Sequence, residues 1–555
     1  MLLEKTKSKL ETAVSALANA TESVSVESRV QLCQECLDGV AAVANEWAEQ
    51  AAIGKGLSAN STLRAEDLMS GPTIVLRQLQ LTIQTLASIQ KHGRPTLTSR
   101  PVRLPNGQLS VPIFPTIGLF DSLTFMGIRA SVRLDAGVDE ANVFGQLPEV
   151  AANGNFNKLT AVLGAGNVSS IPATDSLNRI MFEGHRVLLK LNPVNEYLFP
   201  IFERAFAPLI NANLLRILKG GADIGTEMIQ NELVHDVHIT GSAATHDAIV
   251  WGSDPSERTR RKQANDPLLK KNVTSELGNV SPWIVMPGNY SASQLESQAQ
   301  HVAASITNNA SFNCLATKMI VTWKQWHQRD TFLERIQHYL SKTPVRPAYY
   351  PGAVDRFQRF SGSKTKSDER GCLPWTLLKG QSIDERPELF QEESFVCLCA
   401  ETQLGGDTPE QFLSAATEFV NDRMTGTLCA SITVLPSVRK QLGKAFDRCL
   451  TDLRYGAVCV NQWSGLAYAL ISPPWGAYPG ATLDNVQSGI GSVHNTYLLD
   501  QVEKTVLEGP LVNFPKPVWF ASHRNPVGVV SRLLNLYHRP SMFNLPGLFA
   551  CAIAG

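Results

Sequence analysis

The chain has 555 residues and a formal net charge of zero, from 50 Lys and Arg against 50 Asp and Glu. Hydrophobic residues make up 43% and charged residues 18%, a balance that is typical of globular proteins and excludes a mainly disordered chain. This length predicts two or three domains, and the neutral charge offers no overall field to attract nucleic acid or anionic lipid.

The sequence gives no sign of export or membrane insertion. No apolar run approaches the roughly 20 residues that span a bilayer. The first residues, MLLEKTKSKL, lack the apolar core of a secretory signal. The ten cysteines are scattered, which favours reduced thiols over a disulfide framework. We therefore expect a cytoplasmic protein.

Residues 1–100 are expected to form a helical region. Apolar residues recur at helical spacing over about 28–56, and a second helical stretch runs from about 61 to 91 before Gly93-Arg94-Pro95 ends it. Cys33 and Cys36 form a C-x-x-C on the first of these helices. No strand lies nearby, so we interpret them as packed thiols rather than a redox or metal pair.

From Pro101 the pattern changes to alternating strands and helices. Asn106-Gly107 predicts a hairpin turn between two short extended segments. Beyond it, apolar strand-like runs alternate with helical stretches, which predicts an α/β layer with a largely parallel sheet. A second α/β block is expected to begin near Glu276.

Two glycine-rich turns follow predicted strands. The first, Gly164-x-Gly166-x-x-Ser169, is a dinucleotide fingerprint that lacks its third glycine, and a simple tight turn explains it as well. The second, GGADIG at 220–225, opens a predicted helix. Its backbone N–H groups are placed to face a phosphate, although a plain strand-to-helix turn is nearly as good an explanation.

The strongest chemical signals come later in the chain. Thr240-Gly241-Ser242 ends a strand, and Glu276 stands just ahead of a glycine and a new apolar strand. Cys314 lies where a helix is predicted to begin. Such a position would favour the thiolate and would also hold an oxyanion, because the helix N-terminus offers free N–H groups and a positive dipole.

Together these motifs resemble the aldehyde dehydrogenase superfamily, over roughly residues 101–507. The order and spacing of the motifs carry the resemblance. In chain order they are Asn167 in GAGN, Lys190 in VLLK, GGADIG, ITGS, Glu276 in ELGN, the Cys314 segment, EESF, and PPWGAYPG ahead of SGIG.

The resemblance implies an aldehyde dehydrogenase-like α/β fold: a Rossmann-like cofactor domain, an α/β catalytic domain and a small β-flap for oligomerisation. We expect a homodimer or homotetramer, with the flap at 109–134 and a partner strand near Tyr497. The expected divisions are an N-terminal helical region (1–100), the NAD(P)-binding domain (101–275), the catalytic domain (276–470), a return to the cofactor domain (471–510) and a C-terminal extension (511–555).

The resemblance also implies a covalent mechanism. Cys314 would attack an aldehyde to give a thiohemiacetal, the Asn167 amide and the Cys314 backbone N–H would hold its oxyanion, and Glu276 would activate the water that hydrolyses the thioester. The cofactor would be NAD or NADP. Its expected binding residues are Lys190 at the adenosine ribose, Gly221 and Gly225 in the glycine turn, Gly241 and Ser242 beside the nicotinamide, Glu393 at the nicotinamide ribose, and Phe395 packed nearby.

Each of these residues also has a purely structural interpretation. Cys314 can be read as a buried structural thiol, Asn167 as a turn residue and Lys190 as a solvated strand-end lysine. Glu276 can be read as a carboxylate paired for stability. Glu392 is also placed to take the role of its neighbour Glu393.

Several positions depart from the family pattern. Phe312-Asn313 replaces the usual Gly-Gln before the nucleophile, and Asn167 sits in a GNV form reminiscent of acyl-CoA reductases. The acid after Lys190 is displaced to Glu196, so the choice between NAD and NADP stays open. The basic segment with Arg258, Arg260, Arg261 and Lys262 suits a 2′-phosphate or coenzyme A, but such a run is more often a solvated helix face.

Other catalytic classes find less support. His235, His238 and His246 are spaced poorly for a metal site, and we expect no metal. No G-x-S-x-G elbow supports a serine hydrolase. We therefore expect NAD(P)-dependent oxidation of an aldehyde to a carboxylate. The alternatives are a coenzyme A-dependent acylating dehydrogenase or acyl-CoA reductase, and a non-catalytic scaffold. The tail beyond about residue 509 is expected either to wrap a neighbouring subunit or to narrow a substrate tunnel.

Overall fold

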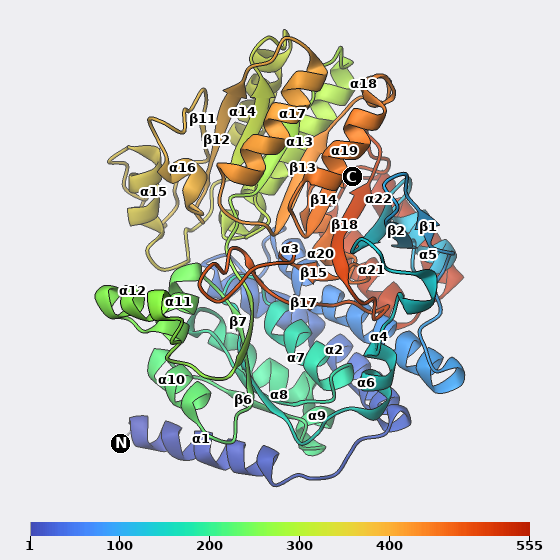
Figure 1. Ribbon diagram of the computed structural model, residues 1–555, viewed down its shortest axis with the longest axis vertical. Coiled ribbons are helices and arrows are strands. Elements are labelled where there is room, and N and C mark those ends of the chain that lie inside the picture. The colour runs from blue at the N-terminus through green and yellow to red at the C-terminus, as the bar shows by residue number, and fades with distance from the viewer. Residues whose placement is uncertain (1) are drawn as a thin grey trace.

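The computed structural model describes residues 2–555, with side chains from Lys7 onward. Two large sheets form its centre, and helices cover them on both sides (Figure 1). This mixed α/β architecture with largely parallel sheets confirms the predicted fold class. Among the described residues, no helix has the length and apolar character that crossing a membrane requires.

The smaller sheet has six strands in the order β16-β8-β7-β4-β5-β6. Its five parallel strands have the spatial order of a Rossmann-type sheet. From β4 the strands are added toward one edge as β5 and β6, and then on the other side of β4 as β7 and β8. The strands are β4 (Leu159–Leu163), β5 (Arg186–Lys190), β6 (Leu215–Leu218), β7 (Asp236–Thr240), β8 (Asn272–Glu276) and the short antiparallel β16 (Gly489–Ile490).

The helices of this half connect its strands and cover both faces of the sheet. Almost every strand residue is buried, as expected for a parallel sheet between helical layers. The helices are α6 (Leu147–Asn153), α7 (Ile171–Met181), α8 (Phe199–Ala205), α9 (Ala207–Asn211), α10 (Ala222–Gln230), α11 (Ala243–Trp251) and α12 (Pro255–Ala264).

The larger sheet has ten strands in the order β1-β2-β3-β18-β14-β13-β9-β10-β12-β11. The seven strands from β18 to β11 are parallel, and β3, β2 and β1 add to them antiparallel. The strands are β1 (Val102–Arg103), β2 (Leu109–Phe114), β3 (Arg129–Leu134), β9 (Pro282–Val285), β10 (Met319–Trp323), β11 (Thr376–Leu378), β12 (Leu398–Leu404), β13 (Cys429–Thr433), β14 (Ala457–Val460) and β18 (Val502–Glu508).

The remaining elements of this half surround the sheet or link it to the smaller one. A two-stranded ribbon pairs β15 with β17. The elements are α5 (Gly118–Thr124), α13 (Ala292–Thr307), α14 (Arg329–Lys342), α15 (Ala353–Ser361), α16 (Glu388–Gln391), α17 (Pro409–Asp422), α18 (Pro436–Leu442), α19 (Lys444–Asp452), α20 (Gly465–Ala469), β15 (Trp475–Gly476) and β17 (Ser492–Val493).

The segment predicted as an oligomerisation flap, residues 109–134, forms β2 and β3 with α5 between them. The Asn106-Gly107 turn joins β1 to β2 as predicted. The flap continues the chain's own large sheet, because β18 pairs with β3 on one side and with β14 on the other. The strand expected near Tyr497 is β18, and it begins at Val502.

The helices of residues 26–92 and the C-terminal helices pack together, and we call them the helical collar (residues 26–92 and 526–553). In Figure 1 the blue helices reach the red ones near α21 and α4. The elements of the collar are α2 (Val26–Gly54), α3 (Arg64–Leu68), a π-helical turn (Met69–Thr73), α4 (Ile74–His92), α21 (Pro526–His538) and α22 (Leu545–Ile553). The first helix, α1 (Leu2–Ala18), lies apart from them and packs on β5, β6 and α10.

Buried polar side chains tie the collar to the sheets. Arg77 of α4 is 1% exposed; its guanidinium donates to both carboxylate oxygens of Asp121 in α5, at 2.8 and 2.9 Å. It also donates to the hydroxyl of Tyr537 in α21 at 3.1 Å and to the Leu470 carbonyl at 2.7 Å. Cys33 and Cys36 are both buried free thiols in α2, which agrees with packing rather than with chemistry.

Candidate active site

The carboxyl ends of the strands in the six-stranded sheet bring most of the predicted residues to one edge. Lys190 is the last residue of β5 and Glu276 the last of β8. Asn167 lies in the turn after β4, Gly221 caps α10 after β6, and Gly241 follows β7. Ligands of open α/β sheets bind outside this edge, at the point where the strand order reverses. The arrangement therefore defines the candidate site.

Cys314 faces this edge from the other half of the molecule. Its thiol donates to Glu276 Oε1 at a sulfur-to-oxygen distance of 3.4 Å. The Ser281 hydroxyl donates to the Cys314 carbonyl at 2.8 Å and fixes the backbone beneath the thiol. Cys314 as a whole residue is half-buried. A nucleophile and a proton acceptor therefore stand within contact of each other.

The expectation that Cys314 begins a helix is wrong. The structure places it in a turn between a 3₁₀ segment (Asn308–Ser311) and β10. Three consecutive non-glycine residues in that segment have positive φ: Asn309 at 51°, Ala310 at 54° and Ser311 at 67°. This left-handed run is strained and replaces the helix that the sequence pattern indicated. No helix dipole therefore supports a thiolate at Cys314.

Asn309 is a site residue that the sequence patterns did not single out. Its buried side-chain amide donates to the carbonyls of Asn167 and Phe312, each at 2.9 Å. The Asn167 amide donates to the same Phe312 carbonyl at 3.2 Å. These bonds join the Asn167 turn to the segment before Cys314. The signal that could have found it was the NNASFNC run, because asparagine adopts left-handed backbone more readily than most residues.

The surroundings of the site raise the pKa values of its acidic groups. Burial raises the pKa of Glu276 to about 7, and the negative charge of Asp175 adds to the effect. Burial also raises the pKa of the Cys314 thiol well above its ordinary value, and the neighbouring Glu276 and Glu393 charges raise it further. At neutral pH Cys314 therefore rests as a thiol and needs a base to activate it.

Glu393, not Glu392, is the second carboxylate at the site. Its side chain packs against Gly278 of the ELGN segment, whereas Glu392 is exposed and pairs with Arg359. Burial raises the pKa of Glu393 to about 7, opposed by the positive charge of Lys318. Phe395 has a positive φ of 42° and packs against aromatic rings on both sides: Tyr350 with centroids 5.1 Å apart and Phe312 at 5.7 Å.

The residues predicted to bind a cofactor lie close to the carboxyl ends of β5, β6 and β7. Burial lowers the pKa of Lys190, whose ammonium donates to the Leu191 carbonyl at 3.2 Å. A β-carbon at Gly225 would lie 3.3 Å from Lys190 Cε, so the glycine lets α10 approach the lysine. A β-carbon at Gly241 would meet nothing within 4 Å. Ser242 caps α11 by accepting the Thr245 N–H at 3.1 Å.

The basic segment and the displaced acid Glu196 both make contacts of their own. The basic segment forms α12, and three of its four cations pair with acids: Arg260 with Glu257, Arg261 with Asp266 and Lys262 with Asp247. This agrees with a solvated helix face. Glu196, the displaced acid, accepts the Gly220 backbone N–H at 2.8 Å and so holds the start of the glycine turn. The sequence patterns indicated no such role.

Of the three histidines, His238 lies in a network of buried polar side chains. His238 is buried, with Nδ1 2.9 Å from the Thr274 hydroxyl and Nε2 3.4 Å from Asp175 Oδ2. The Thr240 hydroxyl donates to the same Asp175 oxygen at 2.9 Å. Among residues 2–555, no group of three or more His, Cys, Asp or Glu side chains is arranged to hold a metal ion.

Comparison with known proteins matches one segment of the chain to a family and the whole chain to a fold. Residues 178–354 match the model of the aldehyde dehydrogenase family. No curated protein matches the sequence. Solved structures match over nearly the whole chain at low identity. The aldehyde dehydrogenase KauB from Pseudomonas aeruginosa is 15% identical, with a TM-score of 0.57 over 91% of this chain and 89% of its own.

Two further structures were solved with cofactors. Glyceraldehyde-3-phosphate dehydrogenase GapN from Methanocaldococcus jannaschii, complexed with NADP, is 14% identical, with a TM-score of 0.57 over 91% of this chain and 95% of its own. A betaine aldehyde dehydrogenase variant from Staphylococcus aureus, complexed with NAD⁺, is 15% identical, with a TM-score of 0.59 over 91% of this chain and 89% of its own.

The fold and the site together define the class: an α/β protein whose cysteine and glutamate meet at the mouth of a Rossmann-type sheet. Residues 178–354 match the aldehyde dehydrogenase family, and the chain as a whole shares the fold of solved aldehyde dehydrogenases. The family match covers the end of α7, the Lys190 strand, the glycine turn, Glu276 and Cys314. Asn167, Glu393 and the helical collar lie outside it.

Proposed function

We propose that this protein oxidises an aldehyde to a carboxylate with NAD or NADP, through a covalent intermediate on Cys314. The observation that carries the proposal is the 3.4 Å contact between the Cys314 thiol and Glu276 Oε1, beside the Asn167 amide. Similar structures hold NAD⁺ and NADP, which supports the cofactor class. In this assignment the six-stranded sheet is the cofactor domain and the ten-stranded sheet belongs to the catalytic domain.

The residues at the edge of the sheet fit a dinucleotide. Glu393 Oε1 is buried and has no hydrogen-bond partner among the described residues, so it is free to accept a ribose hydroxyl. Lys190 and the N-terminus of α10 provide positive potential for the adenosine ribose and the phosphates. Gly241 leaves room beside β7 for a flat ring. What NAD or NADP supplies when bound is a hydride acceptor.

The first chemical step belongs to Cys314 and Glu276. The Glu276 carboxylate accepts the thiol proton, and the sulfur attacks the carbonyl carbon to form a C–S bond. The electron pair of the C=O bond moves to oxygen, and the Asn167 amide stabilises the resulting oxyanion. A side-chain amide has two N–H groups, so one remains for the oxyanion while the other bonds the Phe312 carbonyl. Loss of hydride leaves a thioester on Cys314.

In the second step Glu276 is the base again, once the proton that it took from the thiol has passed to solvent. Its Oε2 is buried and unpartnered among the described residues, which makes it an acceptor for an attacking water. The carboxylate takes the water proton while oxygen attacks the thioester carbon. The C–S bond then breaks, and the sulfur leaves as thiolate and recovers a proton. A carboxyl with a pKa of about 7 is suited to both transfers near neutral pH.

The two alternatives, a coenzyme A-dependent reaction and a non-catalytic scaffold, have less support. Coenzyme A-dependent acylation or acyl-CoA reduction was suggested partly by the basic segment, whose Arg260, Arg261 and Lys262 are paired with acids. A non-catalytic scaffold has no need for a thiol beside an unpartnered carboxylate oxygen. Assembly as a homodimer or homotetramer and a cytoplasmic location remain predictions.

The test follows the absorbance of reduced cofactor with NAD⁺ or NADP⁺ and a panel of aldehydes, with and without coenzyme A. We expect turnover without coenzyme A, and at least about a 10⁴-fold loss in Cys314→Ala, because the covalent route disappears. Cys551→Ala, another half-buried free thiol, is the matched control and should keep full activity. Turnover only with coenzyme A would establish the thioester alternative. Cofactor binding without turnover of any aldehyde or acyl-CoA would indicate a scaffold.

A further inference from the structure

Lys318 is a buried charged residue that the proposed mechanism does not use. It lies four positions after Cys314 and is 3% exposed. Its ammonium donates to the carbonyl oxygen of Ser311 at 3.0 Å and to the Ser311 hydroxyl at 3.2 Å. Burying a charged group is costly unless hydrogen bonds and opposite charges compensate it, so a lysine at this position indicates a specific role.

The bonds of Lys318 close the segment that carries the nucleophile, which we call the Cys314 loop (residues 311–318). Ser311 begins this loop and Lys318 ends it, so the ammonium ties its two ends together. The end at Lys318 is fixed in the large sheet. Its backbone N–H donates to the Ser281 carbonyl at 3.0 Å, and its carbonyl accepts the Ala400 N–H at 2.8 Å. The side chain therefore reaches back to Ser311 from a fixed point.

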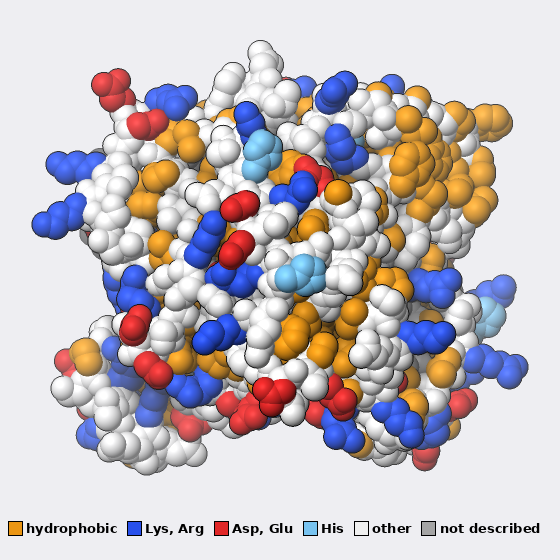
Figure 2. All heavy atoms as spheres, turned by 90° about the horizontal axis from the view of Figure 1, so that it is seen from above, with side chains coloured by type: hydrophobic (Ala, Val, Ile, Leu, Met, Phe, Trp, Pro, Cys, Tyr) orange, Lys and Arg blue, Asp and Glu red, His pale blue; other side chains and the backbone are white. Residues whose placement is uncertain are grey.

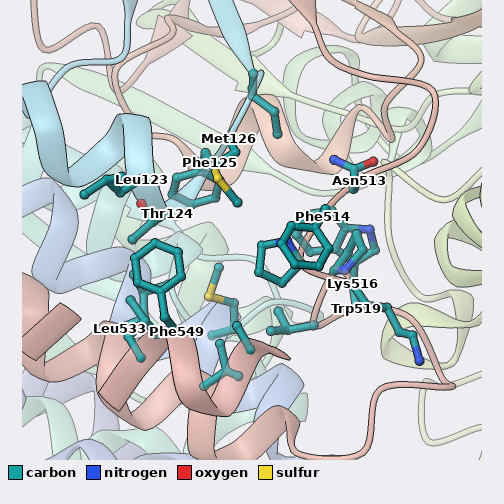
Figure 3. Close-up of a pocket in the computed structure, with 18 residues that line it drawn as sticks. Leu123, Thr124, Phe125, Met126, Asn513, Phe514, Lys516, Trp519, Leu533 and Phe549 are labelled. Atoms are coloured by element: carbon teal, nitrogen blue, oxygen red, sulfur yellow. The ribbon is translucent and has the colours of Figure 1, made fainter. Parts of the chain in front are cut away.

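Cations that stay close to water provide a comparison. Figure 2 shows lysine and arginine side chains spread over one face of the molecule. The half-buried Lys516 lies in the wall of an apolar pocket between the tail, the flap and the helical collar (Figure 3), and its ammonium donates to two main-chain carbonyls of the tail. No residue of the Cys314 loop lines that pocket. Lys318 also donates to a main-chain carbonyl, but in the interior and within the segment that carries the nucleophile.

The start of the Cys314 loop needs support because its backbone is strained. Ser311, with φ of 67°, is the last of three consecutive left-handed residues, after Asn309 and Ala310. Such backbone persists only where surrounding contacts hold it. Asn309 is held by its side-chain bonds and by its N–H, which donates to Glu66 Oε2 at 3.0 Å. Among the described residues, Lys318 is the one donor to the Ser311 carbonyl, and a buried carbonyl without a donor is unfavourable.

The charge of Lys318 also acts on the acidic groups of the site. Burial lowers the pKa of Lys318, and the negative charges of Glu393 and of an ionised Cys314 oppose that shift. In return, the positive charge of Lys318 opposes the rise in the pKa of Glu393. A cation at this position therefore balances Glu393 in addition to bonding Ser311, which a neutral donor would not do.

We infer that Lys318 is a positioning residue of the reaction: it holds the left-handed turn and so keeps the Cys314 thiol against the Glu276 carboxylate. The inference rests on the proposed function for the roles of Cys314 and Glu276. Without the ammonium, the turn relaxes toward ordinary backbone and the thiol moves away from its base. A small displacement of a reacting group greatly reduces the rate, so the effect belongs to kcat and not to the KM of the cofactor.

The first test measures how fast iodoacetamide alkylates Cys314, a reaction that needs neither an aldehyde nor turnover. Mass spectrometry of the Cys314 peptide gives the rate, and the half-buried Cys551 in the same sample reports any general change in thiol exposure. At neutral pH, Lys318→Met should slow alkylation of Cys314 at least about tenfold, because the thiol loses the base that activates it. Lys324→Met, at an exposed lysine just after β10, is the matched control and should behave as wild type.

A rescue variant separates positioning from the loss of a buried charge. Glycine adopts left-handed backbone without strain, so Ala310→Gly should help to hold the turn when the ammonium is absent. The double variant Ala310→Gly/Lys318→Met should therefore be alkylated at least about fivefold faster than Lys318→Met alone. In a Glu276→Gln background the base is already missing, and there Lys318→Met should slow alkylation no further.

A second variant covers the case in which Lys318→Met fails to fold. Lys318→Met/Glu393→Gln removes both buried charges together, so it should fold and show the same slow alkylation of Cys314. An unchanged alkylation rate, a loss that Ala310→Gly does not reduce, or a further loss in the Glu276→Gln background would overturn the inference. If wild type oxidises no aldehyde and still shows the expected alkylation pattern, the proposed function fails and the role of Lys318 in holding the turn stands.

Discussion

The candidate active site and the helical collar both bury charged side chains, but they satisfy them differently. At the site, Glu276 Oε2 and Glu393 Oε1 are buried without partners among the described residues. In the collar, the Arg77 guanidinium makes bonds to Asp121, Tyr537 and a carbonyl. Unmet hydrogen-bonding capacity is available to ligands, whereas satisfied capacity holds elements together. Substitutions in the first region should therefore affect turnover, and those in the second should affect stability.

Replacing the base should have the largest effect on turnover. Glu276→Gln keeps the shape of the side chain but cannot accept a proton, so kcat should fall about 10²–10⁴-fold. The thermal midpoint should not fall, because the variant removes a buried carboxyl that burial disfavours. Single-turnover kinetics should show the hydrolysis step slowed. Unchanged kcat would remove Glu276 from the mechanism.

The same carboxyl should set the pH dependence. Only the carboxylate form accepts a proton, and the pKa of Glu276 is raised to about 7. Activity should therefore rise with pH through about 7 and fall below it. Glu393→Gln serves as the control, because burial raises the pKa of its carboxyl to about 7 as well, but we propose that it binds the cofactor and does not take the proton. That variant should have a higher KM for the cofactor, and its kcat should still rise with pH through about 7.

Removing the buried ion pair of the helical collar should lower stability and leave turnover unchanged. Arg77→Met leaves the Asp121 carboxylate buried without its cation, and the free energy of unfolding should fall by about 3–5 kcal/mol. Urea unfolding measures this, while kcat per folded molecule should stay near wild type. The double variant Arg77→Met/Asp121→Leu should recover most of the stability, since it removes both charges. A double variant as unstable as the single one would contradict this role for the ion pair.

Lys190 should give a smaller effect that is confined to the cofactor. Its ammonium is buried beside α10. If Lys190 binds the dinucleotide as we propose, Lys190→Ala removes a charged hydrogen bond to it, and KM for NAD or NADP should rise about 10–100-fold. Arg260→Ala is the matched cation control. Arg260 is exposed and paired with Glu257, so its removal should change KM less than about twofold. An equal rise in KM for both variants would contradict the proposal that Lys190 binds the cofactor.

Much of the site was predictable because local patterns dictate it. Lys190 and Glu276 end buried apolar strands, and parallel strands bring their carboxyl ends to one edge. The turn before Cys314 was not predictable. Its left-handed run depends on the bonds from Asn309 to Asn167, which is distant in sequence. A local pattern of small and polar residues indicates a helix start there, and the tertiary contacts override it.

The fold shows the same division between local and distant causes. The helices of residues 26–54 and 74–92 follow from spacing, and the hairpin at Asn106-Gly107 follows from turn chemistry. The pairing of β18 with β14 and β3 does not follow from any local pattern, because packing across the whole chain decides which strands pair. The tail likewise forms helices that pack on the collar and wall a pocket, which composition alone does not indicate.

The bond between Arg77 and Tyr537 joins residues 460 positions apart. A ribosome adding about 5–20 residues per second needs roughly half a minute to a minute and a half to make that stretch. During that time the face of α4 that receives α21 has no cover, and a buried cation lacks one of its partners. The contact between α4 and α21 can therefore form only after Tyr537 has been synthesised.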